Sequence, residues 1–248
     1  WKRNSPDIRG VPCTYSPICA RIKMLYRKRR GKIMQEKQKK WILRIALYLI
    51  GIMVLALGIT LNTKTNLGVS PIISMPYAVA QIFGYETGTA VFVAYLIFIV
   101  LQIVLLKGKF PPFQFLQVAA SYLTSAFITI FDRIIPTPDQ MGMRLLVLAL
   151  AIILTGIGAA VTVDVNIVPN PADGLARVLG ECCGKNMGFG KNLFDFSAIV
   201  ISLAIGLIGT GRPVGIGIGT VIAMVCTGRV IAAFNHFAKK KIEEITIA

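Results

Sequence analysis

The sequence is poor in the side chains that metal centres and most enzyme active sites use. It contains a single histidine, His236, and five cysteines, of which Cys182 and Cys183 are adjacent and no two form a CxxC pair. Zinc and redox centres need clustered cysteine and histidine ligands, so neither is expected. HExxH, G-x-S-x-G and paired catalytic carboxylates are also missing from the sequence. We therefore predict no catalytic residues, no metal and no cofactor, and a protein that is not an enzyme.

Acidic side chains are scarce as well. Eleven Asp and Glu stand against 27 Lys and Arg, which gives a net charge of +16 at pH 7. Such a surplus can indicate nucleic-acid binding, but many of the basic residues lie in 1–33 and others flank the first and last hydrophobic runs, as at 37–40 and 239–241. Basic residues beside membrane segments set the orientation of those segments. The sequence therefore predicts contact with membrane lipid and no nucleic-acid partner.

The sequence is instead rich in long hydrophobic runs. Hydrophobic residues make up 55% of the chain, and runs near 20 residues match a hydrocarbon core about 30 Å thick. Six candidate crossings are 41–61, 89–106, 113–135, 145–163, 193–208 and 214–237. We predict an all-α, polytopic membrane helix bundle with about six transmembrane helices.

The first 33 residues show no hydrophobic periodicity, and Met34 opens MQEKQKKWILRIALYLIG, which has the character of a natural start. We expect residues 1–33 to be a basic extension from a mis-assigned start, and the alternative is a genuine cytoplasmic tail that touches anionic lipid. The first apolar run is too long for a cleavable signal peptide. Residues 34–140 and 141–238 are then two membrane repeats, followed by a short charged cytoplasmic tail at 239–248.

The two repeats are related by a shift of 100 residues. Four landmarks coincide under this shift: Gly58 with Gly158, Pro71 with Pro171, Gly84 with Gly184, and Gly88 with Gly188. Three crossings per repeat make the second repeat enter from the opposite side, so we predict inverted repeats of the kind found in secondary transporters. The Lys and Arg distribution then predicts a multi-pass protein of the bacterial cytoplasmic membrane with both termini in the cytoplasm. Eight crossings, with the short segments also spanning, fit this distribution less well.

Each repeat contains an interrupted segment, at 67–84 and 166–184. Asn170 followed by Pro171 is a strong helix start, and Ser70 followed by Pro71 is its counterpart in the first repeat. Two short helices would therefore begin at equivalent places and end near Gly84 and Gly184. A helix start at membrane depth presents unpaired N–H groups that an anion can bind. Alternatively, Ser70, Asn170 and the nearby Asp173 satisfy these ends themselves.

Four charged residues near the second interruption are further candidates. Asp173 and Arg177 are one helical turn apart, and we expect Asp173 to orient Arg177 toward a substrate; a surface ladder of ion pairs continuing to Glu181 is the alternative. Asp195 would bind a proton or cation if it faces the bundle interior, and otherwise it caps a helix begun near Asn192. Asp164 is a second ion-coupling candidate, at the end of the fourth crossing.

The glycine-rich stretch GTGRPVGIGIGT does not match a nucleotide-binding loop, because a membrane helix follows it and the spacing is not G-x-G-x-x-G. Gly211, Gly215 and Gly219 are four residues apart, which predicts a stripe of small residues along the last helix for close packing.

Several of these motifs resemble the bacterial YczE/YitT-like integral membrane proteins. The resemblance rests on LGVSP at 67–71, the G-x-x-x-G-T around 84–89, the P-x-D at 171–173 and GTVIAMVCTGRVIAAF at 219–234, and covers about 42–237. It implies a multi-helix protein of the bacterial cytoplasmic membrane, and transport is only presumed for the family. Ile218 departs from the family pattern, which has a carboxylate at this place.

Together these features predict a secondary transporter that moves a small anionic or zwitterionic solute by alternating access. Ser70, Asn170, Asp173 and Arg177 would bind the solute, and Asp195 or Asp164 would couple an ion. The alternative is a non-transporting membrane scaffold or an accessory protein of a membrane-bound complex. Expected partners are lipid and a small solute, and the sequence leaves a homodimer open.

Overall fold

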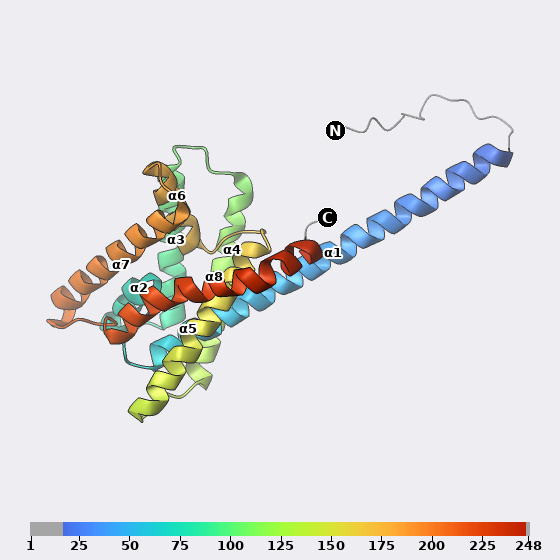
Figure 1. Cartoon of the computed structure of the whole chain (residues 1–248). Helices are drawn as coiled ribbons and strands as arrows, with labels where there is room; N and C mark the ends of the chain where they lie inside the picture. The colour runs from blue at the N-terminus through green and yellow to red at the C-terminus, as the bar shows by residue number, and fades with distance from the viewer. Residues whose placement is uncertain (1–16, 247–248) are drawn as a thin grey trace.

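A computed structural model of the chain describes residues 17–246, and every regular element in this range is a helix (Figure 1). Six helices are long and apolar enough to cross a membrane. This finding confirms the predicted all-α bundle with six crossing helices. They are α1 (Pro17–Lys64, apolar from Gln38), α3 (Thr87–Leu105), α4 (Leu116–Ile134, preceded by a 3-10 turn at Pro112–Phe115), α5 (Met141–Asp164), α7 (Met187–Thr210) and α8 (Ile218–Thr246).

Two short helices interrupt this series, α2 (Pro71–Phe83) and α6 (Pro171–Cys182). Their 13 and 12 residues span only about 20 Å at 1.5 Å per residue, which is less than a hydrocarbon core. Gly84 and Gly184 follow them with φ of 71° and 63°, a left-handed conformation that glycine adopts without steric cost. The chain therefore turns sharply after each short helix and enters the next long one.

The centre of the bundle is an antiparallel crossing of α1 and α5. A Cβ added at Gly158 would lie 2.4 Å from the backbone nitrogen of Leu55, and one added at Gly58 would lie 2.5 Å from that of Thr155. The two glycines therefore make reciprocal contacts, and each lets the partner backbone approach as closely as small residues allow. The landmark glycines of the sequence are thus the point where the two halves touch.

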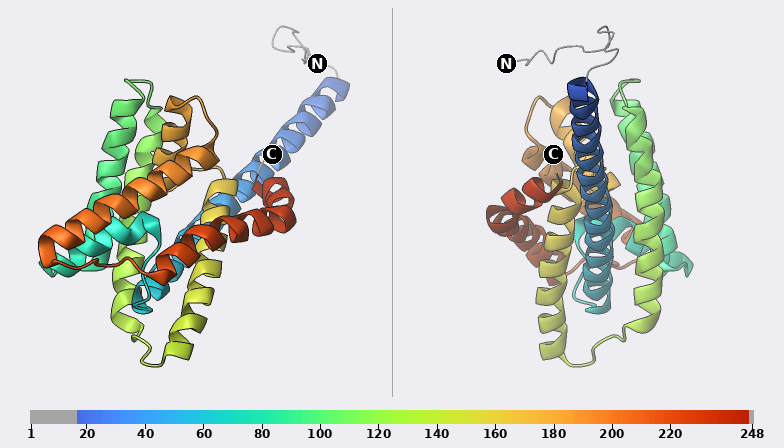
Figure 2. Two further views of the ribbon diagram at one scale, coloured as in Figure 1. Left: turned by 60° about the vertical axis from the view of Figure 1, so that its left-hand side comes forward. Right: turned by 90° about the vertical axis from the view of Figure 1, so that its right-hand side faces the viewer.

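The remaining helices pack in matched pairs around this crossing. Figure 2 shows α8, α5, α1 and α4 side by side in one view, with α4 against α1 and α8 against α5. Each short helix packs on the long helix that follows it and also on a helix of the other half, α2 on α7 and α6 on α3. The short helices are therefore held between the two halves.

The two halves differ in one contact. Helices α3 and α4 pack closely where Ser125 Oγ donates to the Gly88 carbonyl at 2.7 Å. The equivalent helices α7 and α8 diverge after their connecting loop (Figure 1), and Gly188 has no close neighbour beyond its own helix start. The second half is therefore more open than the first between its last two helices.

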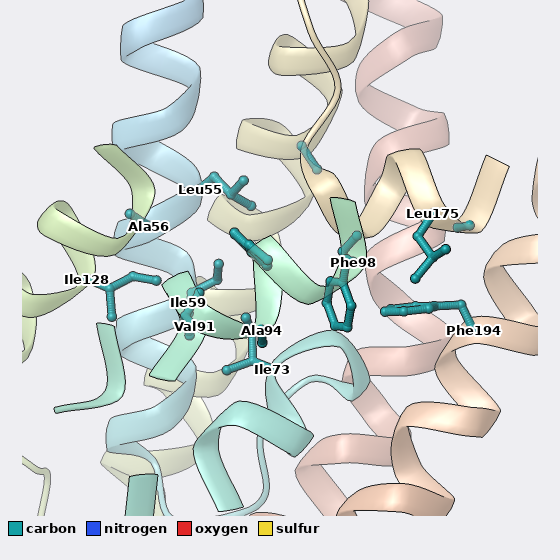
Figure 3. Close-up of a cluster of buried hydrophobic side chains, with 14 residues drawn as sticks. Leu55, Ala56, Ile59, Ile73, Val91, Ala94, Phe98, Ile128, Leu175 and Phe194 are labelled. Carbon is teal, nitrogen blue, oxygen red and sulfur yellow. The ribbon is translucent and has the colours of Figure 1, made fainter. Parts of the chain in front are cut away.

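An apolar core joins α1, α2, α3, α6 and α7. Figure 3 shows Leu55, Ile73, Phe98 and Phe194 pointing into one cluster, with the rings of Phe98 and Phe194 edge to face at 5.2 Å. Large apolar side chains such as Ile208 also cover the outer surface. A helix bundle that is apolar both inside and outside is typical of a protein surrounded by lipid.

The start of α8 corrects the prediction for the last glycine-rich segment. The helix begins at Ile218 and not at 214, so Gly211 and Gly215 lie in the preceding loop and the predicted stripe along one helix is wrong. Gly211 and Gly215 have φ of 69° and 73°, which ends α7 and prevents an earlier helix start. Gly219 alone lies in α8, where its N–H donates to the Leu67 carbonyl at 2.8 Å.

The ends of the chain continue the first and last helices. Residues 17–33 belong to α1 and residues 239–246 to α8, whereas 1–16 and 247–248 lie outside the described residues. The predicted mis-assigned start therefore stays a prediction.

We expect Gly158→Ala to destabilise the protein by about 1–3 kcal/mol, because its methyl group would meet the backbone of α1 and force the two helices apart. Gly142→Ala is the matched control on the same helix, since a Cβ there meets nothing within 4 Å and the change should cost less than about 0.5 kcal/mol. Unfolding of both variants in mild detergent, titrated with SDS, measures the difference. Equal stabilities would contradict the close crossing.

Candidate functional site

A small cavity lies at the centre of the bundle, between the starts of α2 and α6. It offers about 30 Å³ to the centres of water-sized molecules, which is room for one or two waters. Both halves of the chain line it. The polar lining consists of Ser70, Tyr95, Thr155, Asn170, Asp173, Lys191 and Thr227, and the apolar lining of Leu55, Ile59, Ile72, Ile73, Ala159 and Ile231.

Three of the residues predicted from the sequence therefore meet in this cavity: Ser70, Asn170 and Asp173. They come from the two interrupted segments, which lie 100 residues apart in the chain. Pro71 and Pro171 are the first residues of α2 and α6 and direct both helices away from the cavity. The interruptions thus expose polar groups at a depth where an unbroken helix would show only side chains.

The start of α6 is closed by the protein itself. Asn170 Oδ1 accepts the Ala172 N–H at 3.1 Å, and Asn170 Nδ2 donates to the Tyr95 hydroxyl at 3.3 Å. The Asn170 side chain is 8% exposed, so both bonds are shielded from water. At this helix the self-capped alternative is what the structure shows.

The start of α2 is different. The Ser70 side chain makes no capping hydrogen bond, although the Ser70 N–H donates to Asn62 Oδ1 at 2.8 Å. The Ser70 carbonyl accepts the N–H groups of Ile73 and Ser74, and Pro71 has no N–H. The donors that this helix start leaves for the cavity are thus the Ser70 hydroxyl and the Ile72 N–H.

An ion pair between a partly buried lysine and a buried aspartate lies beside these groups on α7. Lys191 Nζ is 3.7 Å from Asp195 Oδ2, one helical turn away. Asp195 is 4% exposed, and its second oxygen, Oδ1, is buried without a hydrogen-bond partner among the described residues. A carboxylate in this position is costly and is more typical of function than of packing.

Asp195 does not cap a helix. Helix α7 begins at Met187, where the Asn186 side chain accepts the Phe189 N–H at 3.0 Å. Asp195 therefore lies two turns inside the helix and faces the interior, and the capping interpretation of this residue is wrong.

Arg177 does not join Asp173. Both residues are on α6, but Arg177 and Glu181 are exposed and line a second, larger cavity near the loop between α3 and α4. The ladder Asp173–Arg177–Glu181 is therefore divided between two sites, and no ion pair among the described residues links its members. Asp164 is buried at the end of α5 and is not part of the lining of the central cavity.

The sequence analysis missed four polar residues of the central site: Lys191, Tyr95, Thr155 and Thr227. The spacing of Lys191 and Asp195, four residues apart at the head of an apolar run, was the available signal for an interior pair. Nothing in the sequence distinguishes Tyr95 from the apolar residues around it, because its role depends on α6 packing against α3.

The site thus combines one ammonium group, two carboxylates, an amide and four hydroxyls in a setting otherwise made of apolar side chains. Charge interactions are stronger in such surroundings than in water. This arrangement is suited to a small molecule that carries both a negative and a positive group, or to a small anion accompanied by a cation.

Comparison with known proteins identifies relatives. The chain is 26% identical over 196 residues to the uncharacterized membrane protein YczE of Bacillus subtilis strain 168, covering 78% of this chain and 86% of YczE. It is 23% identical over 201 residues to the uncharacterized protein YyaS of the same strain, covering 78% of this chain and 95% of YyaS. No solved structure matches the chain.

The relatives confirm the YczE-like resemblance and a protein of the membrane. A family model described as a family of unknown function, DUF6198, matches residues 42–236, which includes every helix of the bundle that lines the central cavity. The chain therefore belongs to the DUF6198 family of membrane proteins.

Proposed function

We propose that the protein is a secondary transporter that binds a small anionic or zwitterionic solute in the central cavity. One observation carries this proposal: polar groups from the interrupted segments of both halves line a single buried cavity together with Lys191. Discontinuous helices that meet at the middle of two related halves are typical of secondary transporters. A scaffold would have no need for the Lys191–Asp195 pair at this depth.

The charges suggest how the solute lies. The negative group of the solute binds at the Ser70 hydroxyl and the start of α2, where no side chain caps the helix, and beside Lys191. A positive group, where present, lies at Asp173. Arg177 has no place in this pose, because it lines the other cavity.

The matched packing of the two halves supports alternating access. In our proposal the halves are inverted repeats that cross at Gly58 and Gly158. The cavity lies at this crossing, so rocking one half against the other opens it to one side at a time. A space for one or two waters corresponds to a closed state between the two openings.

Asp195 is the residue that we propose for ion coupling. Its oxygen Oδ1 is buried without a hydrogen-bond partner among the described residues, and Lys191 connects it to the solute site. When the solute anion draws Lys191 away, Asp195 needs a proton or a cation to remain buried. Solute binding and ion binding thereby become linked.

We further propose that the protein lies in the bacterial cytoplasmic membrane with both termini inside, is not an enzyme, and binds no nucleic acid. The Lys and Arg clusters at the two ends of the chain support this orientation. The loop after α3, the end of α6 and both termini then face the cytoplasm.

A ligand screen tests the solute site. Purified full-length protein in detergent is melted with small carboxylates, amino acids, inorganic anions and amines. We expect carboxylate-bearing compounds to raise the melting temperature. A compound present at a hundred times its dissociation constant should add about 2.7 kcal/mol to the free energy of unfolding. Lys191→Gln should weaken binding about tenfold or more, and Lys185→Gln should leave it unchanged, because Lys185 is exposed outside the cavity. A flat response to every compound would favour the scaffold alternative.

Coupling is tested with Asp195→Asn in proteoliposomes. We expect this variant to bind the best compound of the screen nearly as well as the wild type and to exchange it across the membrane. Uptake driven by an imposed proton or sodium gradient should be lost, because the amide cannot take up the ion. Asp139→Asn, on the exposed connection before α5, is the control. Gradient-driven uptake that survives in Asp195→Asn would show that Asp195 does not couple the ion.

Orientation is tested by labelling cysteines in intact cells with a membrane-impermeant maleimide. Asp139→Cys should react from outside, because its loop is on the side opposite the termini in the proposed orientation. Cys182 and Cys183, exposed at the end of α6, should react only after the cells are permeabilised. The reverse pattern would invert the proposed orientation.

A further inference from the structure

The second cavity lies between the C-terminal half of α6 and the loop that joins α3 to α4. It offers about 170 Å³ to the centres of water-sized molecules, several times the space of the central cavity. Two cations, Lys109 and Arg177, and one carboxylate, Glu181, line it. We call this cavity the vestibule.

The two cations of the vestibule form no ion pair with any acidic residue that the structure describes. The ion pairs among the described residues are Lys64–Asp132, Arg133–Glu86 and Lys191–Asp195. Arg177 and Glu181 are one helical turn apart on α6, a spacing that commonly gives an ion pair, yet they form none. The vestibule therefore has a net charge of +1 and two cationic side chains that are free to bind an anion.

The floor of the vestibule is the amide of Gln102, which lines the cavity and is bonded to the buried amide of Gln117 behind it. Gln102 and Gln117 are both 0% exposed. Gln102 Nε2 donates to Gln117 Oε1 and to the Pro171 carbonyl, both at 3.1 Å, and Gln117 Nε2 donates to Gln102 Oε1 at 3.3 Å. These bonds use the Gln102 amide within the protein, so the donors that the lining leaves for a ligand are the two cations and the amide group of Gln114.

The floor also separates the two cavities. Asn170 lines the central cavity, and Gln102 lines the vestibule. The carbonyl of Pro171, the next residue after Asn170, accepts the hydrogen bond from Gln102. A Cβ added at Gly174 would lie 2.7 Å from Gln102 Oε1, so the amide lies against the backbone of α6. The vestibule and the central cavity are neighbours along α6 with this contact between them.

We propose that the vestibule is a second binding site, selective for an oxyanion such as a carboxylate or phosphate group, with Arg177 and Lys109 as its ligands. Arg presents a planar fork of donors that matches two oxygens of such a group, and Lys adds a point charge. The oxyanion belongs either to a free solute or to the headgroup of an anionic lipid. Its use as a cytoplasmic waiting site for the transported anion rests on the proposed function.

The test is a titration of the purified full-length protein with two probes. Inorganic phosphate represents a free anion, and short-chain phosphatidylglycerol, compared with short-chain phosphatidylcholine, represents a headgroup. We expect Arg177→Gln and Lys109→Gln each to raise the dissociation constant about tenfold, which corresponds to about 1.4 kcal/mol. Arg177→Lys should retain part of the affinity. Lys185→Gln, which removes the same charge just beyond α6, should change it less than about twofold.

Glu181→Gln gives an effect of the opposite sign. Removing the only carboxylate of the vestibule should tighten anion binding, and a variant that merely damages the fold would not do so. A response to phosphate identifies a free anion as the ligand, and a response confined to phosphatidylglycerol identifies a lipid headgroup. Unchanged affinity for both probes in Arg177→Gln and Lys109→Gln, or no binding to the wild type, would overturn the proposal.

The same titrations in Lys191→Gln separate this proposal from the transport proposal. Vestibule binding should persist there, because Lys191 lines only the central cavity. Binding that depends on Arg177 without any solute uptake would leave the vestibule in place and reject transport. Uptake that depends on Lys191 but not on Arg177 or Lys109 would support transport and reject the role of the vestibule in it.

Discussion

The structure depends on one constraint, which is that every broken stretch of backbone inside the membrane must find hydrogen-bond partners in the protein. The non-helical backbone before each short helix, at 65–70 and 165–170, meets this constraint with groups from distant parts of the chain. The Val69 N–H donates to the Gly215 carbonyl, and the Leu67 carbonyl accepts from Gly219. Before α6, the Val168 carbonyl accepts a hydrogen bond from the Tyr48 hydroxyl, and the Val165 carbonyl accepts one from the Arg44 side chain. The interruptions therefore fix how the helices pack.

This constraint also explains why the two halves are similar but not equal. The first interruption receives its partners from Gly215 in the glycine-rich loop and Gly219 at the start of α8. Glycine is needed there because a Cβ at Gly219 would lie 2.8 Å from the Gly68 carbonyl oxygen, and one at Gly215 would lie 2.7 Å from the Tyr77 ring. The second interruption receives its partners from long side chains of α1. As a result α6 has its start closed by Asn170, and α2 keeps donors at Ser70. The two helix starts that line the central cavity therefore differ in the donors they offer to it.

Much of the fold could be predicted from the sequence, because the physics that sets it is local. Hydropathy gave the six crossings, and the Asn-Pro and Ser-Pro pairs gave the two short helices. The errors have a common cause. The glycines at 211 and 215 were interpreted by their spacing, whereas their positive φ places them in a loop. The alternative for Asp195, a cap on a helix begun near Asn192, is wrong because Asn186 begins that helix. Periodicity does not show where a helix begins within several residues.

The site was less predictable than the fold, because it is made by contacts between helices. Ser70, Asn170 and Asp173 could be named since each marks a helix start, but Lys191 and Tyr95 enter the cavity only through the packing of α6 with α7 and α3. The place of Arg177 could not be predicted either. It lies one helical turn after Asp173 on α6, and it lines the vestibule and not the central cavity. Helix α6 runs along both cavities, with Asp173 lining one and Arg177 the other. A single short helix thus presents groups of opposite charge to two neighbouring cavities.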